Sequence, residues 1–137
     1  MSEKTCQDLF FEYHQKIEEF LKFDELNLKE VQMTLPATRH YWVGRLMFHK
    51  QQINRLKKAK EKAVKMLRQK LEHESPIGLT QKTISESICQ NEVVLKIDQE
   101  ILDNELLVEY LTKVEMNFRD AQHGMSNLTK IITLETT

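Results

Sequence analysis

The stretch from Pro36 to His73 constrains the fold of this chain most, because nothing after its first residue is expected to interrupt a helix. Its one glycine, Gly44, costs an exposed helix about 1 kcal/mol relative to alanine. Proline is tolerated in a first helical turn, so Pro36 is predicted to stand there. A basic helix over about 36–73 would be roughly 55 Å long at 1.5 Å per residue, which predicts partners along it.

The rest of the chain is also predicted to be helical. Three glycines and two prolines in 137 residues leave little material for the turns that strands need. We therefore predict one all-α domain over residues 1–137, with two long antiparallel helices forming a hairpin. The turn between them is expected at Ser75–Gly78, and the second long helix at about 80–122. It is expected to start at Thr80, or at Thr83 with Glu86 in a capping box.

Shorter helices are predicted at both ends of the chain. N-terminal helices are expected over about 5–34. Thr5 opens the first with Asp8 in a capping box, and Asp24–Thr34 forms the second. Gly124 is expected to cap or kink the chain. An amphipathic C-terminal helix should then follow at about 125–134, and it either docks on its own core or joins a subunit interface.

The second long helix carries apolar residues on two nearly opposite sides. One side can pair with the basic helix, whereas the other needs a separate cover. A bundle this small can hardly supply that cover, which predicts self-association. The first side has Val93, Val94, Ile97, Ile101, Val108, Leu111 and Phe118, and the second has Ile84, Ile88, Leu95, Leu102 and Leu106.

The positive charge of the chain is concentrated between Arg45 and Lys70. This segment holds ten lysines and arginines and one acid, Glu61, whereas the remainder has 10 basic and 20 acidic residues. Such asymmetry along a chain is more informative than its net charge of −1. We therefore expect the function to reside in this segment.

At 100° per residue the basic helix divides into an apolar seam and an opposite cationic side. The seam consists of Trp42, Leu46, Ile53, Leu56, Val64, Leu67 and Leu71. Lys60 falls within the seam, so it must snorkel or face a partner's acid. His49 lies beside the seam and is predicted to be buried or interfacial. The cationic side holds Arg55, Lys58, Lys62 and Lys65, with Lys50, Lys57 and Arg68 on one shoulder.

The cationic side suits a phosphate backbone, because four collinear cations have no acid among them. Lysine contacts phosphate as a point charge, so the binding is predicted to be non-specific and sensitive to salt. Phe48 projects near the direction of Arg55, one heptad earlier. It is predicted either to stack on a base, which favours single strands, or to pack on a neighbouring subunit. We name Phe48, Arg55, Lys57, Lys58, Lys62, Lys65 and Arg68 as candidate nucleic-acid ligands.

Other classes of function find little support in the sequence. The five histidines are scattered, no metal-binding motif is present, and no glycine-rich phosphate loop occurs, so we expect no enzyme, metal or cofactor. No apolar run is long enough to span a membrane, and the N-terminus does not resemble a signal peptide. Cys6 and Cys89 are expected to be reduced thiols in a cytoplasmic protein.

The order of these features resembles the UvsY family of recombination mediators from T-even-type bacteriophages. Pro36 with Tyr41 and Trp42 resembles the start of that family's long basic helix, and the break near Pro76 and Gly78 matches in place. The run Val94-Leu95-Lys96-Ile97-Asp98 is similar to the family's Val-Leu-Lys-Val-Asp, and Gly124 with its apolar tail resembles the family's C-terminal helix.

This resemblance implies a non-enzymatic, ring-like homo-oligomer of six or seven subunits that binds single-stranded DNA in the host cytoplasm. It implies as partners a RecA-like phage recombinase and a single-strand-binding protein. The family's DNA contact includes a lysine followed two residues later by an arginine. Lys65 stands at the lysine position here, but Leu67 stands at the arginine position, with Arg68 next. Assembly would involve Met125, Leu128, Ile131 and Ile132.

Two alternatives remain open from the sequence. In the first, the protein is a helical structural adaptor whose basic helix binds an acidic protein partner. In the second, it reads duplex DNA. The second finds no helix-turn-helix with a short glycine turn, and no leucine heptads next to the basic helix.

Overall fold

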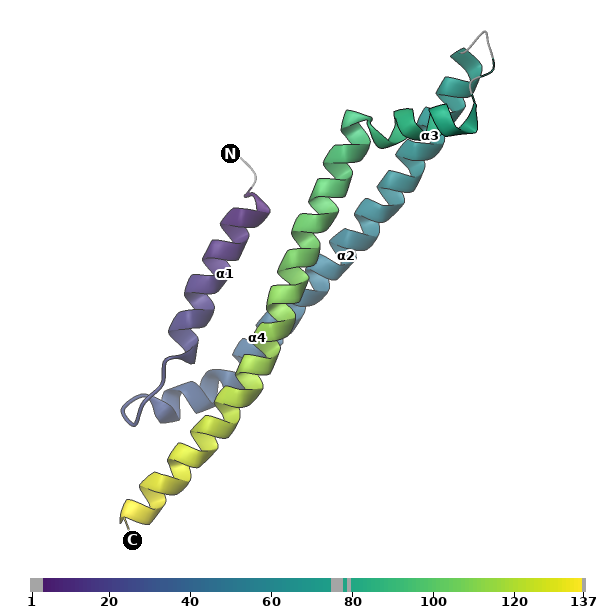
Figure 1. The fold of residues 1–137 in the computed structure, drawn as a ribbon. Helices are drawn as coiled ribbons and strands as arrows, with labels where there is room; N and C mark the ends of the chain where they lie inside the picture. The colour runs from purple at the N-terminus through teal and green to yellow at the C-terminus, as the bar shows by residue number, and fades with distance from the viewer. Residues whose placement is uncertain (1–3, 75–77, 79, 137) are drawn as a thin grey trace. The chain divides into compact units, whose positions relative to one another are not determined.

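Four α-helices make up the computed structural model, which describes residues 4–74, 78 and 80–136 (Figure 1). They are α1 (Cys6–Leu21), α2 (Leu28–Glu74), α3 (Gln81–Cys89) and α4 (Glu92–Thr136). Those residues contain no strand, so the all-α prediction is confirmed. Internal contacts divide the chain into two compact units. The first comprises 1–48 and 107–137, and the second comprises 49–106. Long helices α2 and α4 contribute a segment to each.

Helix α1 begins as predicted. The Thr5 hydroxyl accepts a hydrogen bond from the backbone N–H of Asp8, and the Asp8 carboxylate accepts one from the N–H of Thr5. This reciprocal capping box satisfies two donors that the first turn leaves unpaired. The capping box read from the sequence is therefore confirmed.

The separate helix predicted at Asp24–Thr34 does not form. Instead, the Asp24 carboxylate accepts hydrogen bonds from the N–H groups of Leu26 and Asn27, which favours a turn over a helix. Helix α2 starts directly after this turn, at Leu28, and Pro36 lies inside it instead of opening it.

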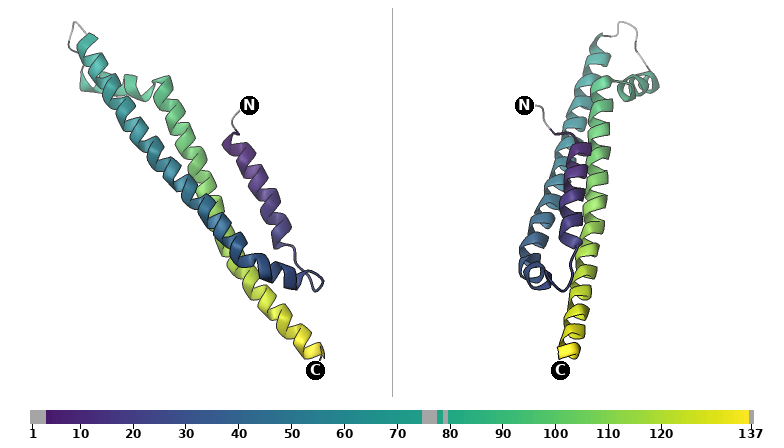
Figure 2. Two further views of the ribbon diagram at one scale, coloured as in Figure 1. Left: turned by 180° about the vertical axis from the view of Figure 1, so that it is seen from behind. Right: turned by 90° about the vertical axis from the view of Figure 1, so that its left-hand side faces the viewer.

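A bend near the start of α2 accommodates the internal proline. Pro36 has no N–H to donate to the carbonyl of the preceding turn, and its ring presses against that turn. The Thr34 hydroxyl also donates to the carbonyls of Glu30 and Val31, a contact that often accompanies bent helices. Both views in Figure 2 show the first part of α2 turned away from the direction in which the helix continues. A proline within a helix is a recognised cause of such a bend.

The single helix predicted over about 80–122 is interrupted. The Thr80 hydroxyl accepts a hydrogen bond from the N–H of Thr83 and so caps α3. Thr80 was one of the two predicted starts. Helix α3 then ends at Cys89. The Asn91 side chain accepts hydrogen bonds from the N–H groups of Val93 and Val94, so it opens α4 as a second cap. Of the turn predicted at Ser75–Gly78, residues 75–77 lie outside the described residues.

The C-terminal helix predicted at about 125–134 is not separate, because α4 continues through Gly124 to Thr136. A glycine ends a helix most readily in the left-handed conformation, and Gly124 does not adopt a positive φ. A Cβ at this position would approach Phe23 Cζ to 3.3 Å. Gly124 therefore permits close packing and does not stop the helix.

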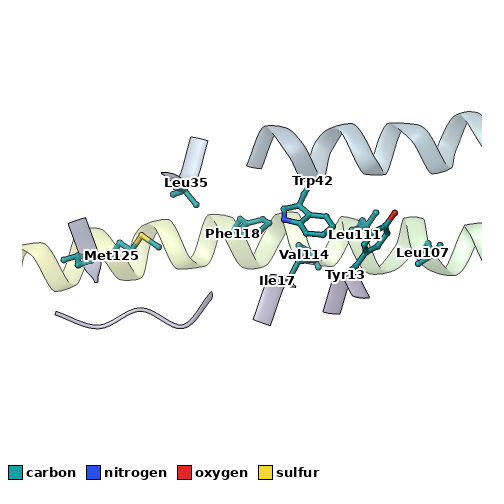
Figure 3. Packing of buried hydrophobic residues seen from close by; sticks show 10 residues of the cluster. Tyr13, Ile17, Leu35, Trp42, Leu107, Leu111, Val114, Phe118 and Met125 are labelled. Carbon is teal, nitrogen blue, oxygen red and sulfur yellow. The ribbon is translucent and has the colours of Figure 1, made fainter. Parts of the chain in front are cut away.

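The core of the first unit forms where α1, the start of α2 and the last part of α4 meet. Tyr13 packs edge-on against Trp42 with ring centroids 5.2 Å apart, and Phe20 packs in the same way against Phe118 at 5.6 Å. Figure 3 shows Trp42, Phe118 and their neighbours between the helices. Such aromatic pairs add about 0.5–1.5 kcal/mol beyond area burial. The buried members are Tyr13, Ile17, Leu28, Leu35, Trp42, Leu107, Leu111, Val114, Phe118 and Met125.

The second unit has a smaller apolar core and several polar contacts between its helices. Two of them join α2 to α4: His49 Nδ1 lies 3.0 Å from Asn104 Oδ1, and Lys60 Nζ lies 2.7 Å from Asp98 Oδ1. Residue numbers rise along α2 as they fall along α4, so these two segments run antiparallel within the unit. The apolar core comprises Ile84, Ile88 and Val94, against which Val64, Leu67 and Leu71 pack.

Phe118→Ala should destabilise the protein by about 3–5 kcal/mol, because it removes a ring that is 0% exposed and leaves a cavity between packed helices. Phe11→Ala makes the same chemical change at a ring that is 62% exposed and should cost less than about 0.5 kcal/mol. Urea denaturation followed by circular dichroism measures both. Equal losses in the two variants would contradict the assigned core.

Candidate nucleic-acid interface

The α2 segment of the second unit carries a row of exposed cations, here called the basic ridge. It consists of Arg55, Lys58, Lys62 and Lys65, all exposed. Their spacing of three, four and three residues keeps them on one side of the helix over about 15 Å. The side facing the core holds Val64, Leu67 and Leu71, which pack on α3 and on the start of α4. This packing fixes the rotation of α2 and turns the ridge towards solvent.

Within the described part of the chain, no ion pair or hydrogen bond of a side chain engages any ridge residue. The neighbouring cation Lys60 behaves differently, because its ammonium pairs with Asp98 across to α4. Lys60 thus faces an acid, as one of the two alternatives required, but the acid comes from the same chain and not from a partner. The ridge cations remain available to an external anion.

The shoulder residues lie in two different environments. Lys57 is exposed, like the ridge. Arg68 is half-buried, and its Nη1 donates a hydrogen bond of 2.9 Å to Gln81 Oε1 on α3. Leu67, which the resemblance aligned with an arginine, packs in the core of the second unit. Arg68 has a structural contact of its own.

Phe48 belongs to the first unit, where it is 38% exposed. The guanidinium of Arg45 lies over its ring, 4.9 Å from the centroid, which is a favourable cation–π contact. Arg45 also donates two hydrogen bonds to the Tyr13 hydroxyl, at 3.0 and 2.6 Å. The sequence counts Arg45 as part of the basic segment, but its guanidinium is engaged by Tyr13 and Phe48 within the first unit. Base stacking by Phe48 stays a prediction.

His49 is 1% exposed, as its place beside the seam predicted. Its partner Asn104 was missed, because an asparagine among the acids of α4 gives no signal of burial. The Asn104 side-chain amide donates to the carbonyl of Glu100 at 2.8 Å, which orients its Oδ1 towards His49. The pair satisfies polar groups that would otherwise be costly to bury, and this is a structural role.

Glu12 of α1 pairs with two nearby lysines, Lys4 before the helix and Lys16 within it. Hydrogen bonds from Lys4 and then Lys16 lower the pKa of the Glu12 carboxyl, and the bond to Glu12 raises the pKa of Lys4. The ion pairs measure 2.8 Å and 3.2 Å. The negative charge of Glu12 is therefore neutralised by residues close to it in the sequence.

The residues predicted to assemble the oligomer fall into two groups. Met125 is 1% exposed and lies in the core of the first unit, and Leu128 and Ile132 pack against that core. Ile131 is 50% exposed and projects from the same helix. Sequence periodicity could not separate these groups, because the side of α4 that is covered depends on α1 and α2.

Among the described residues, no group of three or more His, Cys, Asp or Glu side chains is placed to hold a metal ion. None of the helices in that part of the chain combines the length and apolar character required to cross a membrane.

The chain was compared with known proteins at the levels of sequence and structure. No protein-family model and no curated protein sequence matches it. A solved structure of the bacteriophage T4 recombination mediator protein UvsY is similar, with a TM-score of 0.77 and 14% identity over 96% of this chain and 99% of that chain. A second UvsY structure, from another crystal lattice, has a TM-score of 0.76 and 13% identity over 98% and 100%. The resemblance inferred from the sequence is thus confirmed for the fold, which is similar to that of UvsY.

Proposed function

We propose that this protein binds single-stranded DNA through the basic ridge and acts as a recombination mediator. In this role it helps a RecA-like recombinase onto DNA strands that are covered by a single-strand-binding protein. The observation that carries the proposal is the exposed row of Arg55, Lys58, Lys62 and Lys65, none of which forms an ion pair among the described residues. The similarity in fold to the recombination mediator protein UvsY supports the mediator role.

The chemistry of the ridge sets the mode of binding. Three of its four cations are lysines, which attract phosphate as point charges and do not read bases. Binding should therefore be independent of sequence and should weaken steeply with salt. Contact with four to six phosphates of a single strand gives a log–log salt slope of about −3 to −4 per subunit. Lys57 adds an exposed cation on the shoulder of the same helix.

The first test replaces Arg55, Lys58, Lys62 and Lys65 by alanine. Alanine preserves helix propensity, so the circular dichroism spectrum should not change. Affinity for a labelled oligonucleotide at low salt should fall by at least about 100-fold, and the salt slope should become shallower by about 3. Fluorescence anisotropy at several salt concentrations measures both quantities.

A matched control replaces four exposed cations of the first unit, Lys22, Lys29, Lys113 and Lys130, by alanine. It removes the same charge and should retain most of the affinity. The ridge assignment fails if both variants lose affinity equally. Stronger binding to polyglutamate than to the oligonucleotide would favour the adaptor alternative, and a preference for duplex DNA would favour a duplex reader.

We also propose that the protein assembles into a homo-oligomeric ring, so that several ridges act on one strand. Linked ridges raise the effective concentration of each after the first has bound. Ile131 is the member of the predicted assembly set that offers an exposed apolar surface. Met125 contributes to the core of its own chain, so its substitution would test folding instead.

Ile131→Asp should lower the assembly mass in sedimentation velocity, because a carboxylate in an apolar interface loses its hydration. Met116→Asp, at another exposed apolar position of α4, is the control and should leave the mass unchanged. Retention of the wild-type mass by the Ile131 variant would exclude this residue from the interface.

The mediator role is tested with a RecA-like recombinase and the single-strand-binding protein of one phage. Wild-type protein should shorten the lag before ATP hydrolysis on covered single-stranded DNA, because it gives the recombinase a start site. The ridge variant should not shorten this lag. An unchanged lag with wild-type protein that binds DNA normally would contradict the mediator role while leaving DNA binding intact.

A further inference from the structure

A second surface of the second unit is apolar, exposed and separate from the ridge. Leu95, Leu102 and Leu106 of α4 are spaced by seven and four residues, which places them in one line along the helix. They are 52%, 54% and 63% exposed, and they belong to neither core cluster of the described residues. We call them the leucine stripe. Single exposed leucines are ordinary, but three in line on one helix form a continuous apolar surface.

The other side of α4 already has its cover. Val94 and Ile101 are 2% and 9% exposed and face the interior of the second unit. The sequence placed Ile84 and Ile88 on the same side as the leucine stripe. The break at Asn91 removes them, because they lie on α3 and pack with Val94. The leucine stripe is therefore what remains of the second apolar side after the fold has formed.

Acids border the leucine stripe on both sides. Helical spacing puts Glu92 and Asp103 along one edge and Glu105 along the other. Glu92 and Glu105 are exposed, and Asp103 is half-buried. We call these three the acidic rim. Residues 92–106 contain five acids and one lysine, Lys96, so this segment is strongly negative. Asp98, next to Glu105, is paired with Lys60.

The negative charge of the acidic rim indicates which kind of surface can cover the leucine stripe. Two copies of the stripe packed together would bring one acidic rim against the other, and like charges at close range are unfavourable. The basic ridge has the complementary charge, but its four positions are all cations and offer no apolar side chain to cover leucines. Neither surface of a second copy matches both the charge and the apolar character of the stripe.

We propose that the leucine stripe docks an amphipathic helix of a partner protein, with aliphatic side chains along one face and lysine or arginine at its edges. The aliphatic side chains cover the three leucines, and the cations meet Glu92, Asp103 and Glu105. Helix recognition of this kind depends on apolar anchors at helical spacing, while the charges select the partner. The proposal does not depend on DNA binding, because stripe and ridge lie on different helices and both face away from the core of their unit.

The experiment uses a synthetic helical peptide with three leucines at the same spacing and flanking lysines. A control peptide has glutamate in place of each lysine. The wild-type protein should bind the lysine peptide and not the glutamate peptide. Replacing Leu95, Leu102 and Leu106 by glutamine should weaken binding at least about tenfold, a loss of about 1.4 kcal/mol. The matched control replaces Met33, Met66 and Met116, which are also exposed, and should bind within about twofold of wild type.

The rim is tested by Glu92→Gln, Asp103→Asn and Glu105→Gln together. This variant should bind the lysine peptide several-fold less tightly, and its binding should respond less to salt. Neutralising Glu61, Glu72 and Glu74 of α2 makes the same charge change and should have little effect on peptide binding.

Unchanged peptide binding by the leucine variant would overturn the proposal. A lower assembly mass of that variant would also overturn it, because a second copy would then cover the stripe. Oligonucleotide binding should stay normal in the leucine variant and in the methionine variant, neither of which changes the charge.

Discussion

The packing of one side of α2 on α3 and the start of α4 is the constraint on which the rest depends. Val64, Leu67 and Leu71 pack against Ile84, Ile88 and Val94, and this contact fixes which way α2 is rotated. Cations three and four residues apart on a helix repel one another and weaken it. An isolated helix with this ridge would therefore be poorly stable, and burial of the opposite side offsets the repulsion. Core and ridge are two consequences of one helical periodicity.

The helical class and the strongest local signals were accessible from the sequence. Thr5 and Asp8 form a capping box because both partners lie within four residues, and such contacts need no tertiary information. The break at Asn91 is also local, since asparagine followed by a glutamate is a helix-start signal. The long apolar pattern across that position concealed it. The continuation of α2 through Pro36 and of α4 through Gly124 depends on packing that propensity does not contain.

The candidate site likewise has features that follow from local helical spacing and features that depend on packing between helices. Helical spacing predicted which cations lie opposite the core, and Arg55, Lys58, Lys62 and Lys65 are exposed accordingly. It could not predict that Tyr13 accepts hydrogen bonds from Arg45, or that Gln81 accepts one from Arg68. Both of these partners belong to another helix. The fold thus removes some cations from the basic segment and leaves the ridge as its accessible part.

The most direct measurement locates the DNA on the protein. An oligonucleotide with photoreactive pyrimidines can be cross-linked to the wild-type protein, and the attached peptides can be mapped by mass spectrometry. The account predicts cross-links concentrated on α2 between Arg55 and Lys65. Cross-links confined to α1 or to the last part of α4, with none on this segment, would contradict it.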